Sequence, residues 1–265
     1  MSSRRDEMLT EMGLTPLWRL RERASIPLAA GATDDTRAAL EAAASEKAGS
    51  IPKAVAAPPA LRAGDERRAA IMRMDWTALK QAVGACVDCA LHAKRNKTVF
   101  GVGGENADWM FVGEGPGADE DAQGEPFVGQ AGKLLDNMLA AIKLDRTEKN
   151  VYICNVVKCR PPGNRNPEAE EALKCEPYLH RQIELVKPRL IVALGRVAAL
   201  NLLAREASIA SLRGRVLEYR GTPLIVTYHP AYLLRNLTDK AKAWEDLCFA
   251  VRTMAHLQSQ VSAPI

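Results

Sequence analysis

Short apolar runs alternate with helical segments from residue 109 onward, and this alternation limits the fold more than any other feature of the chain. Four runs are short and almost wholly apolar, as buried strands are. They are 109–113, 151–157, 189–195 and 223–228. Three segments have helical spacing instead, namely 130–142, 167–186 and 240–257. The alternation predicts an α/β fold with three α/β/α layers and a mostly parallel central sheet.

Polar or glycine-rich stretches follow the first, second and last of these predicted strands. They are 113–121, 155–167 and 228–235. In parallel α/β sheets, ligands bind at the carboxyl ends of the strands. We therefore expect the three stretches to line one functional cleft.

The first 72 residues differ in composition from the rest of the chain. Residues 29–60 contain 13 alanines and almost no large apolar side chain, so packing cannot offset their ordering entropy. We predict a short amphipathic segment over 1–26, an Ala/Pro-rich flexible linker over 27–72 and a folded domain over 73–260. The apolar residues around Trp18 suit docking on the folded domain or on an unidentified protein partner, and a tail with no binding role is the alternative.

Charge and hydropathy set broad limits on function. The chain has 36 Lys and Arg against 32 Asp and Glu, and this net charge of +4 permits nucleic-acid binding without requiring it. No apolar stretch approaches the ~20 residues of a membrane span. We expect a soluble, cytoplasmic, monomeric protein with no membrane partner.

Four cysteines have a spacing that suits a metal centre. They are Cys86, Cys89, Cys159 and Cys175. Zinc ribbons show two close pairs, whereas the second pair here is spread over 15 residues, which favours a 4Fe-4S cluster held by four thiolates. Burial of all four as apolar residues stays open as the alternative. Cys154 and Cys248 are interpreted as packing residues.

The glycine-rich stretch 113–129 superficially resembles a dinucleotide-binding fingerprint. Its glycines do not follow the G-x-G-x-x-G spacing, and Pro116 lacks the N–H that a phosphate requires, so a Rossmann cofactor site is excluded. Glycines at a strand end also let a flat ligand approach the backbone. Phe127 is then either a stacking platform or a core residue.

His229 is one of four histidines and stands at the end of a predicted strand, before Pro230. Its ring should face the same cleft as the other two loops. Because a lone histidine is more often structural, a functional and a structural role stay equally open.

Three separated segments carry a resemblance to a known family. They are 86–135, 153–179 and 226–235. Together they resemble the family 4 iron-sulfur uracil-DNA glycosylases over about residues 79–247. The resemblance implies a three-layer α/β/α fold, a 4Fe-4S cluster on the four cysteines, and excision of uracil from single- or double-stranded DNA.

The resemblance also implies roles for individual residues. Phe127 would stack on the flipped uracil, Asn155 would read its pairing edge, and His229 would contact the base as it leaves. Glu114 and Gly115 occupy the motif that positions or activates water, and a role of Glu114 in stabilising the sugar cation stays open. Two departures stand out: Ala231 replaces a serine of many members, and the N-terminal 75 residues lie outside the minimal family.

Other residues are candidates for contact with DNA. Leu233 or Leu234 would wedge the vacated base stack, with Arg235 on a phosphate. Lys158, Arg160 and Arg165 form a basic loop suited to phosphates. The alternatives are two core leucines and a solvated charged loop.

The predicted enzyme is monofunctional, because no lysine lies in the glycine-rich or histidine motifs to form a Schiff base. Two rival functions stay open: a non-catalytic DNA-binding or replication-associated module with a structural metal, and a glycosylase for another deaminated base.

Overall fold

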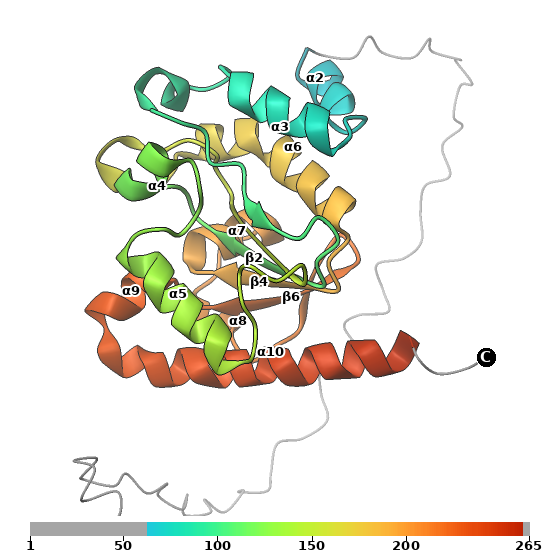
Figure 1. Ribbon diagram of the computed structural model, residues 1–265, viewed down its shortest axis with the longest axis vertical. Helices are drawn as coiled ribbons and strands as arrows, with labels where there is room; N and C mark the ends of the chain where they lie inside the picture. The colour runs from blue at the N-terminus through green and yellow to red at the C-terminus, as the bar shows by residue number, and fades with distance from the viewer. Residues whose placement is uncertain (1–62, 262–265) are drawn as a thin grey trace, which may run out of the picture. The chain divides into compact units, whose positions relative to one another are not determined.

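A six-stranded sheet forms the centre of the computed structural model, which describes residues 63–261 (Figure 1). The strands are β1 (Val102–Gly103), β2 (Trp109–Gly113), β3 (Val151–Asn155), β4 (Leu190–Leu194), β5 (Leu217–Tyr219) and β6 (Thr222–Thr227). Their order across the sheet is β1-β3-β2-β4-β6-β5. The four central strands run parallel, and each edge strand pairs antiparallel with its neighbour.

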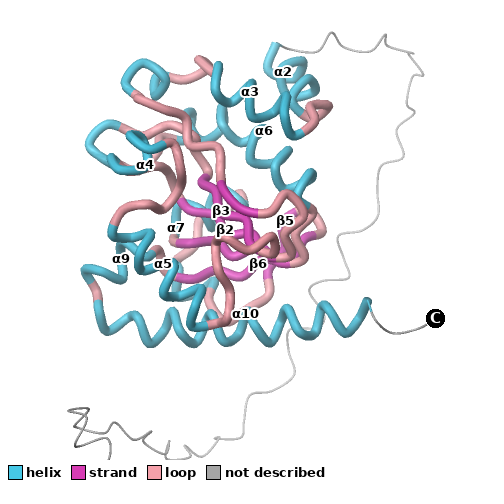
Figure 2. The backbone as a smooth tube through the Cα atoms, in the orientation of Figure 1, coloured by secondary structure: helices cyan, strands magenta, loops and turns pink. Residues whose placement is uncertain are grey.

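Helices cover both faces of this sheet. They are α2 (Ala63–Ile71), α3 (Trp76–Ala85), α4 (Ala118–Gln123), α5 (Gln130–Ala141), α6 (Ala169–Val186), α7 (Arg196–Leu203), α8 (Ile209–Leu212), α9 (Pro230–Arg235) and α10 (Lys240–Val261), with short 3-10 turns η1 (Ala90–Lys94), η2 (Pro162–Asn164) and η3 (Leu237–Asp239). One face packs on α6, α7 and α8, and the other on α5 and α10. Figure 2 shows the magenta strands between these cyan helices. The predicted three-layer fold class is confirmed.

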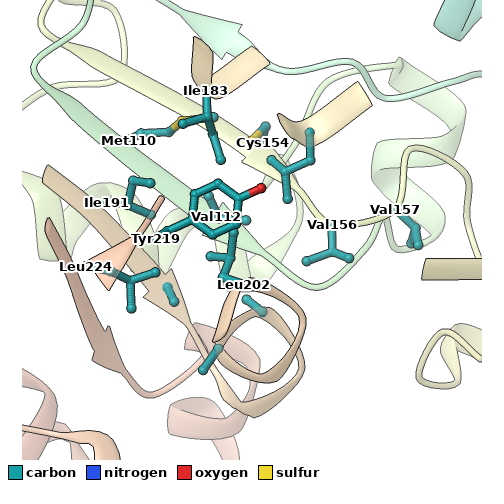
Figure 3. Close-up of a cluster of buried hydrophobic side chains, with 14 of the residues drawn as sticks. Met110, Val112, Cys154, Val156, Val157, Ile183, Ile191, Leu202, Tyr219 and Leu224 are labelled. Atoms are coloured by element: carbon teal, nitrogen blue, oxygen red, sulfur yellow. The ribbon is translucent and has the colours of Figure 1, made fainter. Parts of the chain in front are cut away.

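Alternating side chains along β2 build the two core layers. Met110 and Val112 pack on the side of α6 and α7, where Figure 3 shows them near Cys154. Trp109 and Phe111 pack on the opposite side, against α5 and α10. Each of these five side chains is at most 5% exposed. Burial of a large apolar side chain contributes about 1.5–3 kcal/mol, so both layers stabilise the sheet. The interpretation of Cys154 as a packing residue is confirmed.

The carboxyl ends of the parallel strands meet at one edge of the sheet. Gly113 at the end of β2 pairs with Asn155 at the end of β3, and Leu194 of β4 pairs with Thr227 of β6. The backbone pairing of β2 and β3 continues beyond the strands, since Val156 N donates to Gly113 O at 2.9 Å. The loops after β2, β3 and β6 therefore begin at the same edge of the sheet, with β4 between β2 and β6.

The N-terminal helices α2 and α3 pack against α6 through a small core of their own, which includes Ile71, Leu79 and Tyr178. Helix α2 lies inside the range 27–72 that we assigned to a flexible linker. For residues 63–71 that assignment is wrong, because Ile71 is 2% exposed and Arg68 pairs with Glu176 of α6. The amphipathic segment 1–26 and the remaining linker up to residue 62 lie outside the described residues.

Three further outcomes concern the described part of the chain. The edge strands β1 and β5, with two and three residues, were not predicted. Cys248 on α10 is only half-buried, although we interpreted it as a packing residue. No helix between residues 63 and 261 is long and apolar enough to cross a membrane.

Candidate functional site

A cleft of about 770 Å³ opens at the carboxyl ends of the parallel strands. Seven of the residues singled out from the sequence line it: Glu114, Gly115, Phe127, Asn155, Arg165, His229 and Arg235. The structure thus brings together the loops after β2, β3 and β6, as the strand pattern indicated. Arg160 and Leu234 do not line the cleft.

Phe127 forms part of the cleft wall in an unusual backbone conformation. Its φ angle is +56°, a left-handed value that costs a non-glycine residue about 1 kcal/mol. Two side chains hold this segment in place. The Glu120 carboxylate accepts hydrogen bonds from Val128 N and Gly117 N, each at 3.0 Å. The Arg146 guanidinium donates to Phe127 O at 2.9 Å. Neither Glu120 nor Arg146 was singled out from the sequence.

Gly113 allows Asn155 and Phe127 to approach each other. A Cβ atom on Gly113 would lie 2.4 Å from Asn155 Oδ1 and 2.5 Å from Phe127 Cζ, so no larger residue fits. Asn155 is 1% exposed, and its Oδ1 atom has no hydrogen-bond partner among residues 63–261. An unpaired buried acceptor costs about 1–3 kcal/mol. A ligand with an N–H donor would remove that cost.

His229 caps helix α9 and faces the ring of Phe127, with 5.6 Å between ring centroids. Burial, aided by the positive charge of Arg235, lowers the pKa of His229 to about 4. The imidazole is therefore neutral at pH 7. Its Nδ1 atom accepts a hydrogen bond from Ala231 N at 3.2 Å, which leaves the proton on Nε2. His229 thus presents a neutral N–H donor.

Glu114 follows β2 directly and lines the same cleft. Its backbone carbonyl accepts from Val157 N at 3.2 Å, which fixes the main chain there. Burial raises the pKa of the Glu114 carboxyl above its ordinary value. No described residue donates a hydrogen bond to this carboxylate, so it is available to water or a ligand.

A second, smaller cavity is lined by all four of the cysteines that the sequence pattern grouped: Cys86, Cys89, Cys159 and Cys175. None of them is in a disulfide. Within residues 63–261, no three His, Cys, Asp or Glu side chains converge closely enough to hold a single metal ion. Burial raises the pKa of the Cys175 thiol to about 12, against the opposing effect of the nearby Lys158.

Arg95 is a residue of this cavity that the sequence analysis missed. Its guanidinium donates to Cys159 Sγ at 3.2 Å and to Cys86 O at 2.7 Å, and so bridges two of the cysteine-bearing segments. The available signal was an arginine six residues after the Cys-x-x-Cys pair. Charge-assisted hydrogen bonds of this kind stabilise anionic sulfur.

The basic loop after β3 differs from what the sequence suggested. Lys158 is 1% exposed and donates to Asn155 O at 2.7 Å, so the prediction that it binds phosphate is wrong. Arg165 lines the cleft but already forms a two-point contact with Glu171, at 2.7 and 2.9 Å. Arg160 donates to Asn164 Oδ1 at 2.7 Å. DNA contact by Arg160 and Arg165 stays a prediction.

The two leucines of α9 are now distinguished. Leu233 is 1% exposed and packs with α5 and α10, so it cannot serve as a wedge. Leu234 is 41% exposed beside the cleft residue Arg235, and it remains the candidate.

Comparison with known proteins places this chain in a family. A sequence profile of the Uracil DNA glycosylase superfamily matches residues 100–248. A type-4 uracil-DNA glycosylase of Archaeoglobus fulgidus is 50% identical over 158 residues, which span 57% of this chain and 78% of the relative. The type-4 uracil-DNA glycosylase of Thermotoga maritima is 43% identical over 166 residues, which span 62% and 85%. A type-5 uracil-DNA glycosylase of Pyrobaculum aerophilum is 34% identical over 148 residues, which span 49% and 64%. The matched region contains the loops after β2, β3 and β6 that line the cleft. The chain belongs to the uracil-DNA glycosylase superfamily, among its type-4 members.

Proposed function

We propose that this protein hydrolyses the N-glycosidic bond of deoxyuridine in DNA as the first step of base excision repair. The observation that carries the proposal is the unpartnered Oδ1 atom of Asn155, buried in the cleft beside the Phe127 ring. Family membership supports the same activity. A uracil inside a duplex is out of reach, so the nucleotide must first flip out of the stack at a cost of a few kcal/mol.

Phe127 provides the surface on which the flipped base stacks. Stacking on one aromatic ring returns about 1–3 kcal/mol, which offsets much of the flipping cost. Because Glu120 and Arg146 hold the backbone around Phe127, the ring is in place before the base arrives.

Asn155 distinguishes uracil from cytosine. Uracil presents an N–H donor at N3 and an acceptor at O4, whereas cytosine presents an acceptor at N3 and an amino donor at C4. The free Oδ1 of Asn155 matches the N3–H of uracil, and the amide nitrogen matches O4. In this orientation cytosine would leave buried polar groups unpaired, at about 1–3 kcal/mol each.

His229 and Glu114 act on the two fragments of the breaking bond. When the bond between C1′ and N1 breaks, its electron pair leaves with the uracil, and negative charge develops on O2. The neutral His229 donates its Nε2–H to that oxygen. Glu114 orients a water molecule and takes its proton as the water oxygen bonds to C1′. Glu114 then releases that proton to solvent, and the uracil anion takes one from solvent.

The reaction is monofunctional in this proposal. A lyase step needs an amine that attacks the sugar, and no lysine lines the cleft within residues 63–261. Lys158, the nearest candidate in sequence, is buried and bonded to Asn155 O.

The four cysteines are proposed to hold a 4Fe-4S cluster. Each thiolate of such a cluster binds a different iron, so the four sulfurs surround one cavity without converging on a single point. The residues fit this requirement, since all four line one cavity and none of them is in a disulfide. When bound, the cluster would link the segments before β1, after β3 and in α6.

DNA is the proposed partner, with Leu234 as the wedge and Arg235 on a phosphate. The rival of a non-catalytic DNA-binding module is disfavoured, because it would not require Phe127, Asn155 and His229 to meet in one cleft. A glycosylase for another deaminated base is tested by the oligonucleotide panel below.

The substrate is tested on oligonucleotides that contain uracil, cytosine or hypoxanthine at one position. We expect the protein to release uracil, and Asn155→Ala to slow that release about 100-fold, because it removes two hydrogen bonds to the base. Asn155→Asp should also be slow on uracil and gain weak activity on cytosine, whose amino group a carboxylate accepts. A wild-type protein without uracil release would overturn the proposed function, and wild-type rates in both variants would remove Asn155 as the reader.

The role of Gly113 predicts a loss of activity without a loss of fold. Gly113→Ala places a methyl group against Asn155 and Phe127, so we expect uracil release to fall about 100-fold, as misplaced reactive groups do. Gly84→Ala is the matched control, because nothing described beyond the adjacent backbone of its own helix lies within 4 Å of the new Cβ. Single-turnover kinetics and thermal melting measure both variants, and equal rates would contradict the crowding argument.

The pH dependence reports on Glu114. Burial raises the pKa of Glu114, so kcat should fall as pH falls through that raised pKa, where the carboxylate becomes protonated. His229, with a pKa of about 4, stays neutral above this value and adds no second transition near neutral pH. Glu114→Gln should lower kcat about 100-fold and abolish the acidic limb. Glu125→Gln, on an exposed residue outside the cleft, should keep the wild-type profile.

The cysteine site predicts iron in the purified protein. We expect broad absorbance at the blue end of the visible spectrum and iron in metal analysis. Cys175→Ala should lose the iron and lower solubility, whereas Cys248→Ala, on α10 and away from the cavity, should not. Stoichiometric zinc without iron, in protein never exposed to chelator, would contradict the cluster.

A further inference from the structure

Lys158 occupies an unusual position between the cleft and the cysteine cavity. The residue is 1% exposed and is one of those that line the cavity of the four cysteines. The Nζ atom donates to Asn155 O at 2.7 Å. The Lys158 carbonyl accepts from Val99 N at 2.8 Å, so the main chain is fixed as well. One residue therefore contacts the proposed base reader and lines the proposed metal site.

The ammonium group of Lys158 has no carboxylate as an ion-pair partner among the described residues. Between residues 63 and 261, no carboxylate forms an ion pair with it, and the neutral carbonyl of Asn155 is the acceptor of its hydrogen bond. A buried ammonium without negative charge nearby is strongly destabilising. Asp88 also lines this cavity, but its carboxylate is paired with Arg67, so the four cysteines are the remaining groups that become anionic when they bind iron.

We propose that Lys158 is a positioning residue that couples the cysteine site to Asn155. Its charge stabilises the anionic cluster, and its N–H donor holds the Asn155 main chain at the end of β3. This inference rests on the proposed cluster. Loss of the cluster would leave the Lys158 charge without compensation, and Asn155 would lose a fixed anchor.

The test uses substitutions that separate the charge from the hydrogen bond. Lys158→Met removes both, whereas Lys158→Gln removes the charge and keeps an N–H donor on a side chain one atom shorter. Lys174→Met is the matched control, because it makes the same change of charge at an exposed lysine beside Cys175. Circular dichroism and melting establish that each protein is folded, and Lys158→Gln carries the charge test if Lys158→Met fails to fold.

Two quantities are measured on each full-length protein. The first is the rate at which visible absorbance and iron are lost in excess chelator. We expect about tenfold faster loss for both Lys158 variants and a wild-type rate for Lys174→Met. The second is the pair of steady-state constants KM and kcat for uracil release from DNA, which are compared between variants. We expect KM to rise about tenfold in Lys158→Met, with a smaller rise in Lys158→Gln and a smaller change in kcat.

The outcomes distinguish this inference from the function on which it rests. Wild-type protein that contains no iron would overturn the proposed cluster. If the wild-type protein contains iron and the Lys158 variants lose it at the wild-type rate, the charge role of Lys158 is overturned and the proposed cluster is not. An unchanged KM in Lys158→Met would overturn the coupling to Asn155.

Discussion

The cleft depends on the register between β2 and β3, which sets Gly113 opposite Asn155. Since Gly113 has no side chain, the Asn155 amide and the Phe127 ring occupy the space beside it. The pairing continues past both strands to Glu114, whose carbonyl accepts from Val157 N. The hydrogen bonds of the sheet thus fix the main chain of Asn155 and Glu114, two of the four proposed key residues. Gly113 leaves room for the third, Phe127, before any base enters.

Two acids at the start of α4 extend this rigidity to the rest of the site. Glu120 binds the N–H groups of the segment around Phe127. Its neighbour Asp121, 1% exposed, accepts from Asn96 N at 2.9 Å and from Asn96 Nδ2 at 2.6 Å. Asn96 directly follows Arg95, which bonds Cys159. The cleft and the cysteine cavity are therefore connected through these hydrogen bonds and the short stretches of chain between them, with Asp121 as the buried residue of the set.

The sequence predicted the central strands and the long helices well, because burial of their side chains depends on a local period of two or 3.6 residues. It also placed Phe127, Asn155 and His229 near one another, since parallel strands end at one edge of a sheet. It failed for Lys158, whose neighbours suggested a basic loop although tertiary packing buries it. Likewise, the choice between Leu233 and Leu234 required the orientation of α9, and the short strands β1 and β5 have no period long enough to detect.

The left-handed backbone of Phe127 has a consequence for the stability of the whole domain. Glycine or asparagine would adopt a φ of +56° with less strain, so the phenylalanine ring is kept there at a cost to folding of about 1 kcal/mol. The same ring is 5% exposed and packs in the core layer of α5 and α10, so its replacement would lose more burial energy than the relief of strain returns. Packing of the ring therefore holds the backbone in a conformation that the residue alone would avoid, so relief of this strain is no route to a more stable protein.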